Sequence, residues 1–70
     1  MNYTVIYEAT PTGYSAYVPD LPGCVAAGGT HAEVQRLIRS AIRSHLKVMR
    51  SLGEPIPQPS TWSGTVAASR

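Results

Sequence analysis

The sequence is poor in the side chains that build disulfides, metal sites and catalytic centres. Its 70 residues include one cysteine, two histidines and four carboxylates. One cysteine excludes an internal disulfide, and Cys24, His31 and His45 do not have the spacing of metal ligands. We therefore expect neither a metal ion nor a cofactor.

Long apolar runs are also missing. No stretch approaches the roughly 20 residues that cross a bilayer. The N-terminus, MNYTVIYEATP, has no basic segment followed by an apolar one, as a signal peptide would. Together with the lone thiol, this pattern favours a cytoplasmic protein that does not contact a membrane.

The short length limits how the chain can be stabilised. We expect residues 1–70 to form a single domain, with 58–70 as its tail, because a chain of this size cannot hold two cores. Small domains usually need a disulfide, a metal ion or a partner chain. Since the first two are not expected, the sequence predicts self-association as a dimer or tetramer.

No catalytic motif is visible. The chain has no glycine-rich phosphate loop, nucleophile elbow or metal-binding pattern. Catalysis also requires a walled pocket, which 70 residues can hardly build. The sequence therefore predicts a binding module and not an enzyme.

Three short runs in the first half are typical of β-strands. Residues 2–8, 14–18 and about 24–28 are rich in β-branched, aromatic and small side chains. Proline and glycine punctuate the connections at 9–13 and 19–23. Connections this short favour an antiparallel meander.

The first predicted strand has apolar side chains on both faces. Tyr3, Val5 and Tyr7 share one face, and Ile6 lies on the other. A single helix covers only one face of a sheet, and an uncovered apolar face usually marks an interface. We take Tyr3, Val5 and Tyr7 as the candidate oligomer interface, with the choice between the two faces left open.

A long helix follows the strands. Thr30 and Glu33 form a capping-box pattern before an apolar periodicity of helical spacing. Gly53 is suited to the position after the helix, and Pro55 prevents continuation. The sequence predicts a helix over about 31–52.

The segment after the helix has two interpretations. Alternating prolines at 55–59 favour extended chain. Residues 65–68 then form either a short fourth strand, parallel to and beside the first, or part of a frayed tail. The expected fold class is α+β, with a three-stranded meander, one long helix and an optional fourth strand.

The helix has one strongly basic face. Five of the six cations in the chain fall within an arc of about 80°, opposite the apolar side. They are Arg36, Arg39, Arg43, Lys47 and Arg50. The stripe is either a solvated face or a docking surface for a polyanion such as RNA or DNA. Charged stripes are more often solvated faces, but the absence of interleaved carboxylates is an argument for docking, because neighbouring like charges repel.

Two further side chains each allow a functional and a structural interpretation. His45 lies on the apolar side of the helix, where it is either a general base or a packed, hydrogen-bonded histidine. Cys24 is either a reactive thiol or a small buried one. We favour the structural interpretation for both, because no acidic or thiol partner lies one helical turn from His45.

Several motifs together resemble the HicB-like antitoxin family. They are the GYSAYVPDLPGC run at 13–24, the Gly-Thr before the helix, Ala41, Ile42, His45 and Leu46 within it, and Gly-Glu-Pro-Ile-Pro at 53–57. The resemblance implies a partial ribonuclease-H-like fold in the order β-β-β-α-β. It also implies that the chain binds and neutralises a HicA-like toxin, a small ribonuclease that cleaves messenger RNA.

The chain departs from this family in two respects. Nothing after Pro59 could form the DNA-binding domain that many members carry, and the chain is basic where the family's first domain is commonly acidic. The alternative function is therefore a stand-alone homo-oligomeric module that binds nucleic acid through the basic helix face. For a toxin, the candidate contact residues lie in and before the rigid turn: Tyr14, Tyr17, Asp20, Leu21 and Pro22.

Overall fold

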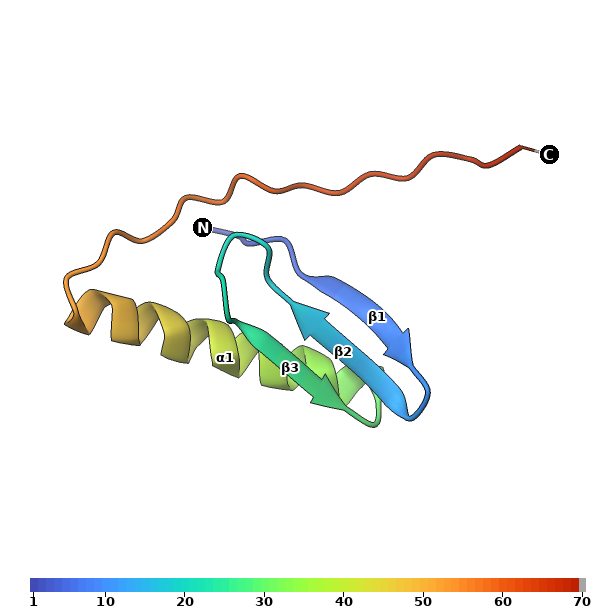
Figure 1. Ribbon diagram of the computed structural model, residues 1–70, viewed down its shortest axis with the longest axis horizontal. Helices are drawn as coiled ribbons and strands as arrows, with labels where there is room; N and C mark the ends of the chain where they lie inside the picture. The colour runs from blue at the N-terminus through green and yellow to red at the C-terminus, as the bar shows by residue number, and fades with distance from the viewer. Residues whose placement is uncertain (70) are drawn as a thin grey trace.

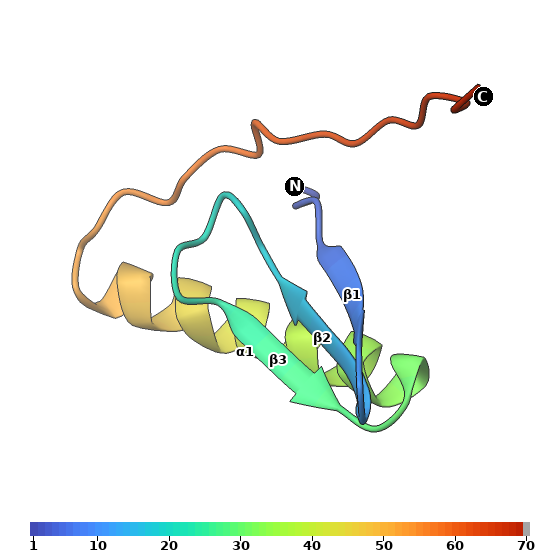
Figure 2. The same cartoon turned by 45° about the vertical axis from the view of Figure 1, so that its right-hand side comes forward.

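A computed structural model describes residues 1–69 as a three-stranded sheet with one helix (Figure 1). The strands are β1 (Ile6–Thr10), β2 (Gly13–Tyr17) and β3 (Val25–Gly28), followed by α1 (His31–Ser51). The sheet is antiparallel with the order β1-β2-β3. Figures 1 and 2 show α1 lying across one face of it. The predicted α+β meander is confirmed.

The first strand lies further along the chain than predicted, at 6–10 instead of 2–8. Thr10 pairs with Gly13, so the connection is a two-residue turn and not the longer one expected at 9–13. At the other end, Tyr17 is the last paired residue of β2 and lies opposite Ile6. Residues before Ile6 have no partner strand because Pro19 ends β2 and turns the chain away.

The connection between β2 and β3 is a compact, self-bonded loop. The Val18 N–H donates to the Cys24 carbonyl at 3.1 Å, and the Leu21 N–H donates to the Val18 carbonyl at 3.0 Å. Gly23 completes the turn with φ of 84°, a left-handed conformation that glycine adopts without strain. Within this loop, Leu21 is completely buried.

Local chemistry sets both ends of α1, close to the predicted range of 31–52. The Thr30 hydroxyl accepts a hydrogen bond from the Glu33 N–H at 3.1 Å, as the N-cap pattern predicts. At the C-terminus, Gly53 has φ of 70°. Its N–H donates to the Arg50 carbonyl, and the Glu54 N–H donates to the Met49 carbonyl. These two bonds form a Schellman motif.

The core lies between the sheet and the first half of α1. Its buried side chains are Ala16, Val18, Leu21, Cys24, Val34 and Ile38. The helix packs against β2 and β3. Tyr3, Val5 and Tyr7 are half-buried against this core, so the side of the N-terminal segment that they occupy is the one facing the helix.

No fourth strand forms within residues 1–69, so the strand considered at 65–68 is absent. The chain after α1 instead runs extended past the N-terminus and away from the sheet (Figures 1 and 2). Side chains hold it: the Tyr3 hydroxyl donates to the Pro57 carbonyl, and the Thr4 hydroxyl donates to the Thr61 carbonyl at 2.6 Å. Such bonds fix the segment without requiring the regular register of a strand.

Candidate partner-binding site

The helix is much longer than the strands beneath it. The 21 residues of α1 span roughly 31 Å, whereas the five residues of β1 or β2 span roughly 17 Å. The apolar side of the helix therefore continues beyond the end of the sheet. Val34 and Ile38 are buried, while Val48 and Leu52, in the last turns, are exposed.

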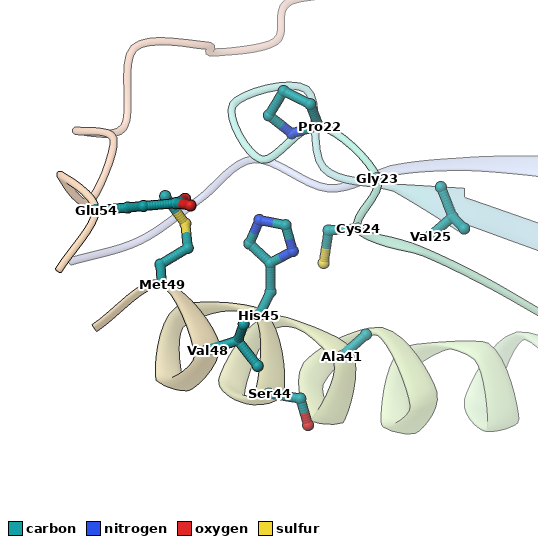
Figure 3. A pocket seen from close by; sticks show the side chains of 10 residues that line it. All are labelled: Pro22, Gly23, Cys24, Val25, Ala41, Ser44, His45, Val48, Met49 and Glu54. Carbon is teal, nitrogen blue, oxygen red and sulfur yellow. The ribbon is translucent and has the colours of Figure 1, made fainter. Parts of the chain in front are cut away.

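An open groove of about 640 Å³ lies between the second half of α1 and the β2–β3 loop (Figure 3). It is lined by Pro22, Gly23, Cys24, Val25, Ala41, Ser44, His45, Val48, Met49 and Glu54. Most of these side chains are apolar. A concave, apolar surface with a few polar groups is the usual form of a binding site.

Two chemically distinctive side chains line this groove. Figure 3 shows the His45 ring and the Cys24 thiol on opposite walls, both within the groove. Cys24 is only 3% exposed, and its burial raises the pKa of the thiol. The thiol therefore stays protonated near neutral pH, which makes it a poor nucleophile. The predicted buried cysteine is confirmed, and the groove is suited to binding more than to chemistry.

The five residues predicted to contact a toxin do not share one surface. Leu21 is fully buried and is not available to a partner in this conformation. Tyr14 and Tyr17 are both partly exposed, but they point to opposite faces of the sheet because they are three residues apart in β2. Pro22 is exposed and lines the groove. Of the predicted set, Pro22 borders the concave surface.

Asp20, the remaining member of that set, holds the chain after the helix. Its carboxylate accepts hydrogen bonds from the backbone N–H groups of Ser60 and Thr61, both at 3.0 Å. It also accepts from their two hydroxyls, at 2.9 and 2.8 Å. These bonds, the backbone ones first, lower the pKa of Asp20 from 3.8 to about 2. We refer to this arrangement as the Asp20 anchor.

Sequence reasoning missed this anchor because its partners are some 40 residues away. The available signal was a turn aspartate together with an adjacent serine and threonine in an extended tail. These three residue types supply a carboxylate acceptor and four donors, but nothing in their spacing places them together.

An aromatic cluster at the start of α1 was also missed. The His31 ring lies 4.7 Å from the Tyr7 ring and 5.6 Å from the Tyr14 ring, measured between centroids. Tyr7 and Tyr14 come together because Tyr14 pairs with Ala9, two residues beyond Tyr7. The cluster ties the beginning of the helix to β1 and β2.

The basic stripe lies at the surface as predicted. Arg36, Arg39, Arg43, Lys47 and Arg50 are all exposed. The buried residues of α1, Val34 and Ile38, face the sheet. The stripe is thus accessible, and its polyanion binding stays a prediction.

Among residues 1–69, no three His, Cys, Asp or Glu side chains lie close enough together to hold a metal ion. In the same residues, no helix combines the length and the apolar character that a membrane crossing requires.

The sequence matches a model of the family described as "HicB-like antitoxin of bacterial toxin-antitoxin system" over residues 3–69. The chain therefore belongs to the HicB-like antitoxin family. The resemblance stated from the motifs at 13–24 and 53–57 is confirmed.

Individual relatives agree with this assignment. An uncharacterised 14.9 kDa protein of Haemophilus phage HP1 is 36% identical over 83% of this chain, which spans only 44% of the phage protein. A UPF0150 protein of Synechocystis is 34% identical over 81% of this chain and 73% of its own length. A UPF0150 protein of Helicobacter pylori is 39% identical over 66% of this chain and 64% of its own length.

A solved structure is similar over most of the chain. A chain of a HicA3 and HicB3 toxin-antitoxin complex superimposes with a TM-score of 0.72 at 30% identity. The match covers 84% of this chain and 69% of that chain.

Proposed function

We propose that this chain is an antitoxin that binds a HicA-like toxin through protein–protein contact and suppresses its cleavage of messenger RNA. The observation that carries the proposal is the likeness to a chain of the HicA3 and HicB3 complex over 84% of the present chain. Family membership over residues 3–69 supports the same role.

The groove beside α1 is our candidate for the toxin contact. Its apolar lining includes Val48, which is 56% exposed, and the half-buried Met49. Covering them with a partner removes apolar surface from water, which favours association. The loop wall is rigid because its prolines fix φ and its own backbone hydrogen bonds close it, so little conformational entropy is lost when a partner binds.

A single charge substitution tests the groove. Val48→Glu places a carboxylate in the apolar surface, and we expect it to weaken binding of the toxin from the neighbouring reading frame by at least about tenfold. Gln35→Glu introduces the same charge elsewhere on the helix, at an exposed position, and should leave binding unchanged. Titration calorimetry and a ribonuclease assay of the toxin measure both effects.

The outcomes test the antitoxin function separately from the place of the toxin contact on the chain. If the unmodified chain forms no complex with the toxin, the antitoxin function is refuted. If it forms a complex that both variants bind equally well, the toxin contacts another surface, and the turn with Tyr14, Tyr17 and Pro22 is the next to test.

We further propose that the chain has no catalytic activity of its own and acts in the cytoplasm. The lone, protonated thiol of Cys24 fits a reducing compartment and offers no activated nucleophile. Purified protein supplied with magnesium or manganese should not degrade single-stranded RNA or an RNA–DNA hybrid. Metal-dependent cleavage that disappears in Glu8→Gln or Asp20→Asn would contradict this proposal.

A second candidate function is nucleic-acid binding by a self-associated form. The exposed cations of the basic stripe support it, because they lie on one face of α1 with no carboxylate between them. An electrophoretic mobility shift with RNA and DNA distinguishes this function from toxin binding. The choice of dimer or tetramer is left to sedimentation.

A further inference from the structure

The chain beyond the Asp20 anchor is an exposed arm, which we define as residues 62–69. Trp62 is 85% exposed and Val66 is 94% exposed. Figures 1 and 2 both show the arm leaving the body of the molecule in an extended conformation. Residues four apart share one side when a chain adopts strand geometry, so these two side chains can contact one surface together. The arm thus has two apolar side chains that residues 1–69 leave largely uncovered.

The face of the sheet opposite α1 has an apolar row that is partly uncovered, because Tyr17 and Val25 are exposed while Ile6 is half-buried. Tyr17 pairs with Ile6 on one side and with Val25 on the other, so the three side chains cross the sheet together. They point away from the helix, because the neighbouring Ala16 is buried beneath it. Tyr17 is 41% exposed and Val25 is 64% exposed. We call Ile6, Tyr17 and Val25 the outer row.

The arm and the outer row are matched in length. Trp62 and Val66 are separated by roughly 13 Å of extended chain, and the outer row spans two interstrand spacings, roughly 10 Å. An arm that crosses the strands can therefore place one apolar side chain at each end of the row.

The arm also begins at the end of the sheet where the outer row lies. Thr61 is held by Thr4 and by Asp20. Thr4 precedes Ile6 by two residues, and Asp20 follows Tyr17 by three. These bonds fix the root of the arm and direct the rest away from its own sheet (Figure 1).

We propose that the arm of one copy packs Trp62 and Val66 onto the outer row of a second copy of this chain and that the partner returns the same contact. Each copy has both the arm and the row, at the same end of the molecule, so a twofold axis satisfies both contacts at once. A second copy is the favoured occupant because the exchange covers both exposed surfaces. Self-association is also one of the ways in which so small a domain is stabilised.

This interface replaces the one predicted at Tyr3, Val5 and Tyr7. Those three side chains are half-buried against the chain's own core. The other face of the sheet is the open one, and its apolar row includes Ile6.

The protein contains its own probe, because Trp62 is the only tryptophan. We expect its fluorescence to shift to shorter wavelength as protein concentration rises, together with a change from monomer to dimer in sedimentation velocity. Tyr17→Glu should abolish the shift. Trp62→Ser should raise the dimer dissociation constant at least about tenfold, as loss of a buried aromatic contact does. Circular dichroism verifies folding, and Val25→Lys serves as a second variant of the row.

The control is Gln35→Glu, which introduces the same charge at an exposed position of α1 and should leave the assembly unchanged. The assay contains only this chain, so its result does not depend on whether the chain binds a toxin. Emission typical of an exposed indole at every concentration would overturn the proposal. It is also overturned if dimers form equally well with Trp62→Ser and Tyr17→Glu, or if the shift occurs only after a toxin or RNA is added.

Discussion

Asp20 binds Thr61 through two hydrogen bonds that join positions far apart in the chain. The Thr61 N–H donates to Oδ2 at 3.0 Å, and the Thr61 hydroxyl donates to Oδ1 at 2.8 Å. Ser60 repeats the pattern with its own N–H and hydroxyl. Both carboxylate oxygens are therefore occupied, and the segment before the arm is fixed to the β2–β3 loop.

Replacing this carboxylate should release the segment after the helix. In Asp20→Asn, one oxygen becomes a donor NH₂ group and meets the N–H or hydroxyl donors of Ser60 and Thr61. We expect faster hydrogen exchange at the amides of Ser60 and Thr61, with unchanged protection in α1. Glu8→Gln, an exposed strand carboxylate, is the matched control. Equal exchange in both variants would show that the anchor does not hold the segment in solution.

The anchor should also respond to acid. The pKa of Asp20 is about 2 in the folded chain against 3.8 for an unperturbed aspartate. A lowered folded pKa means that the anchor's contribution is complete above about pH 5 and is lost as pH falls through the folded value. The amide shifts of Ser60 and Thr61 should titrate with a midpoint near 2. A midpoint at the ordinary aspartate value would contradict the hydrogen-bonded arrangement.

Leu21 should be a major contributor to stability although it lies in a loop. It is completely buried, whereas Leu52 is 66% exposed. Leu21→Ala should lower the free energy of unfolding by about 2–5 kcal/mol, because it leaves a cavity in the core. Leu52→Ala should change it by less than about 0.5 kcal/mol. Urea denaturation of the two variants measures the difference, and similar midpoints would disprove the assigned burial.

Charge reversal tests the basic stripe. Arg39→Glu, Arg43→Glu and Lys47→Glu together should abolish binding of RNA or DNA, whose affinity should also decrease steeply with salt. The fold should persist, because all three side chains are exposed. A toxin complex formed at the groove should be largely unaffected. If nucleic-acid binding, assembly and toxin binding are all unchanged, the stripe is only a solvated face.

The accurate part of the sequence analysis depended on local chemistry. Thr30 and Gly53 mark the ends of the helix because capping bonds and positive φ involve only neighbouring residues. The meander was predictable because short connections between adjacent strands favour antiparallel pairing, whatever their exact length. Recognition of the family depended on the turn motif at 13–24, which this chemistry makes distinctive.

Less accurate were the features that depend on which surfaces meet. β1 was placed too early because its extent depends on where β2 ends. Both faces of the first strand have apolar side chains, so alternation could not show that Tyr7 faces the helix and Ile6 does not. For the same reason the sequence could not show that Leu21 is buried and that Asp20 is bound to the tail; the toxin contacts themselves stay a prediction.

The sequence by itself determined the elements of this protein, their order and its family, because hydrogen-bonding and dihedral preferences act over a few residues. Only the tertiary structure decided how far the helix extends past the sheet, and so created the groove lined by His45 and Val48. It also decided that Asp20 holds Thr61 and leaves Trp62 exposed. The contact between Asp20 and Thr61 joins residues some 40 positions apart. Such pairing follows from packing in three dimensions and not from any periodicity along the chain.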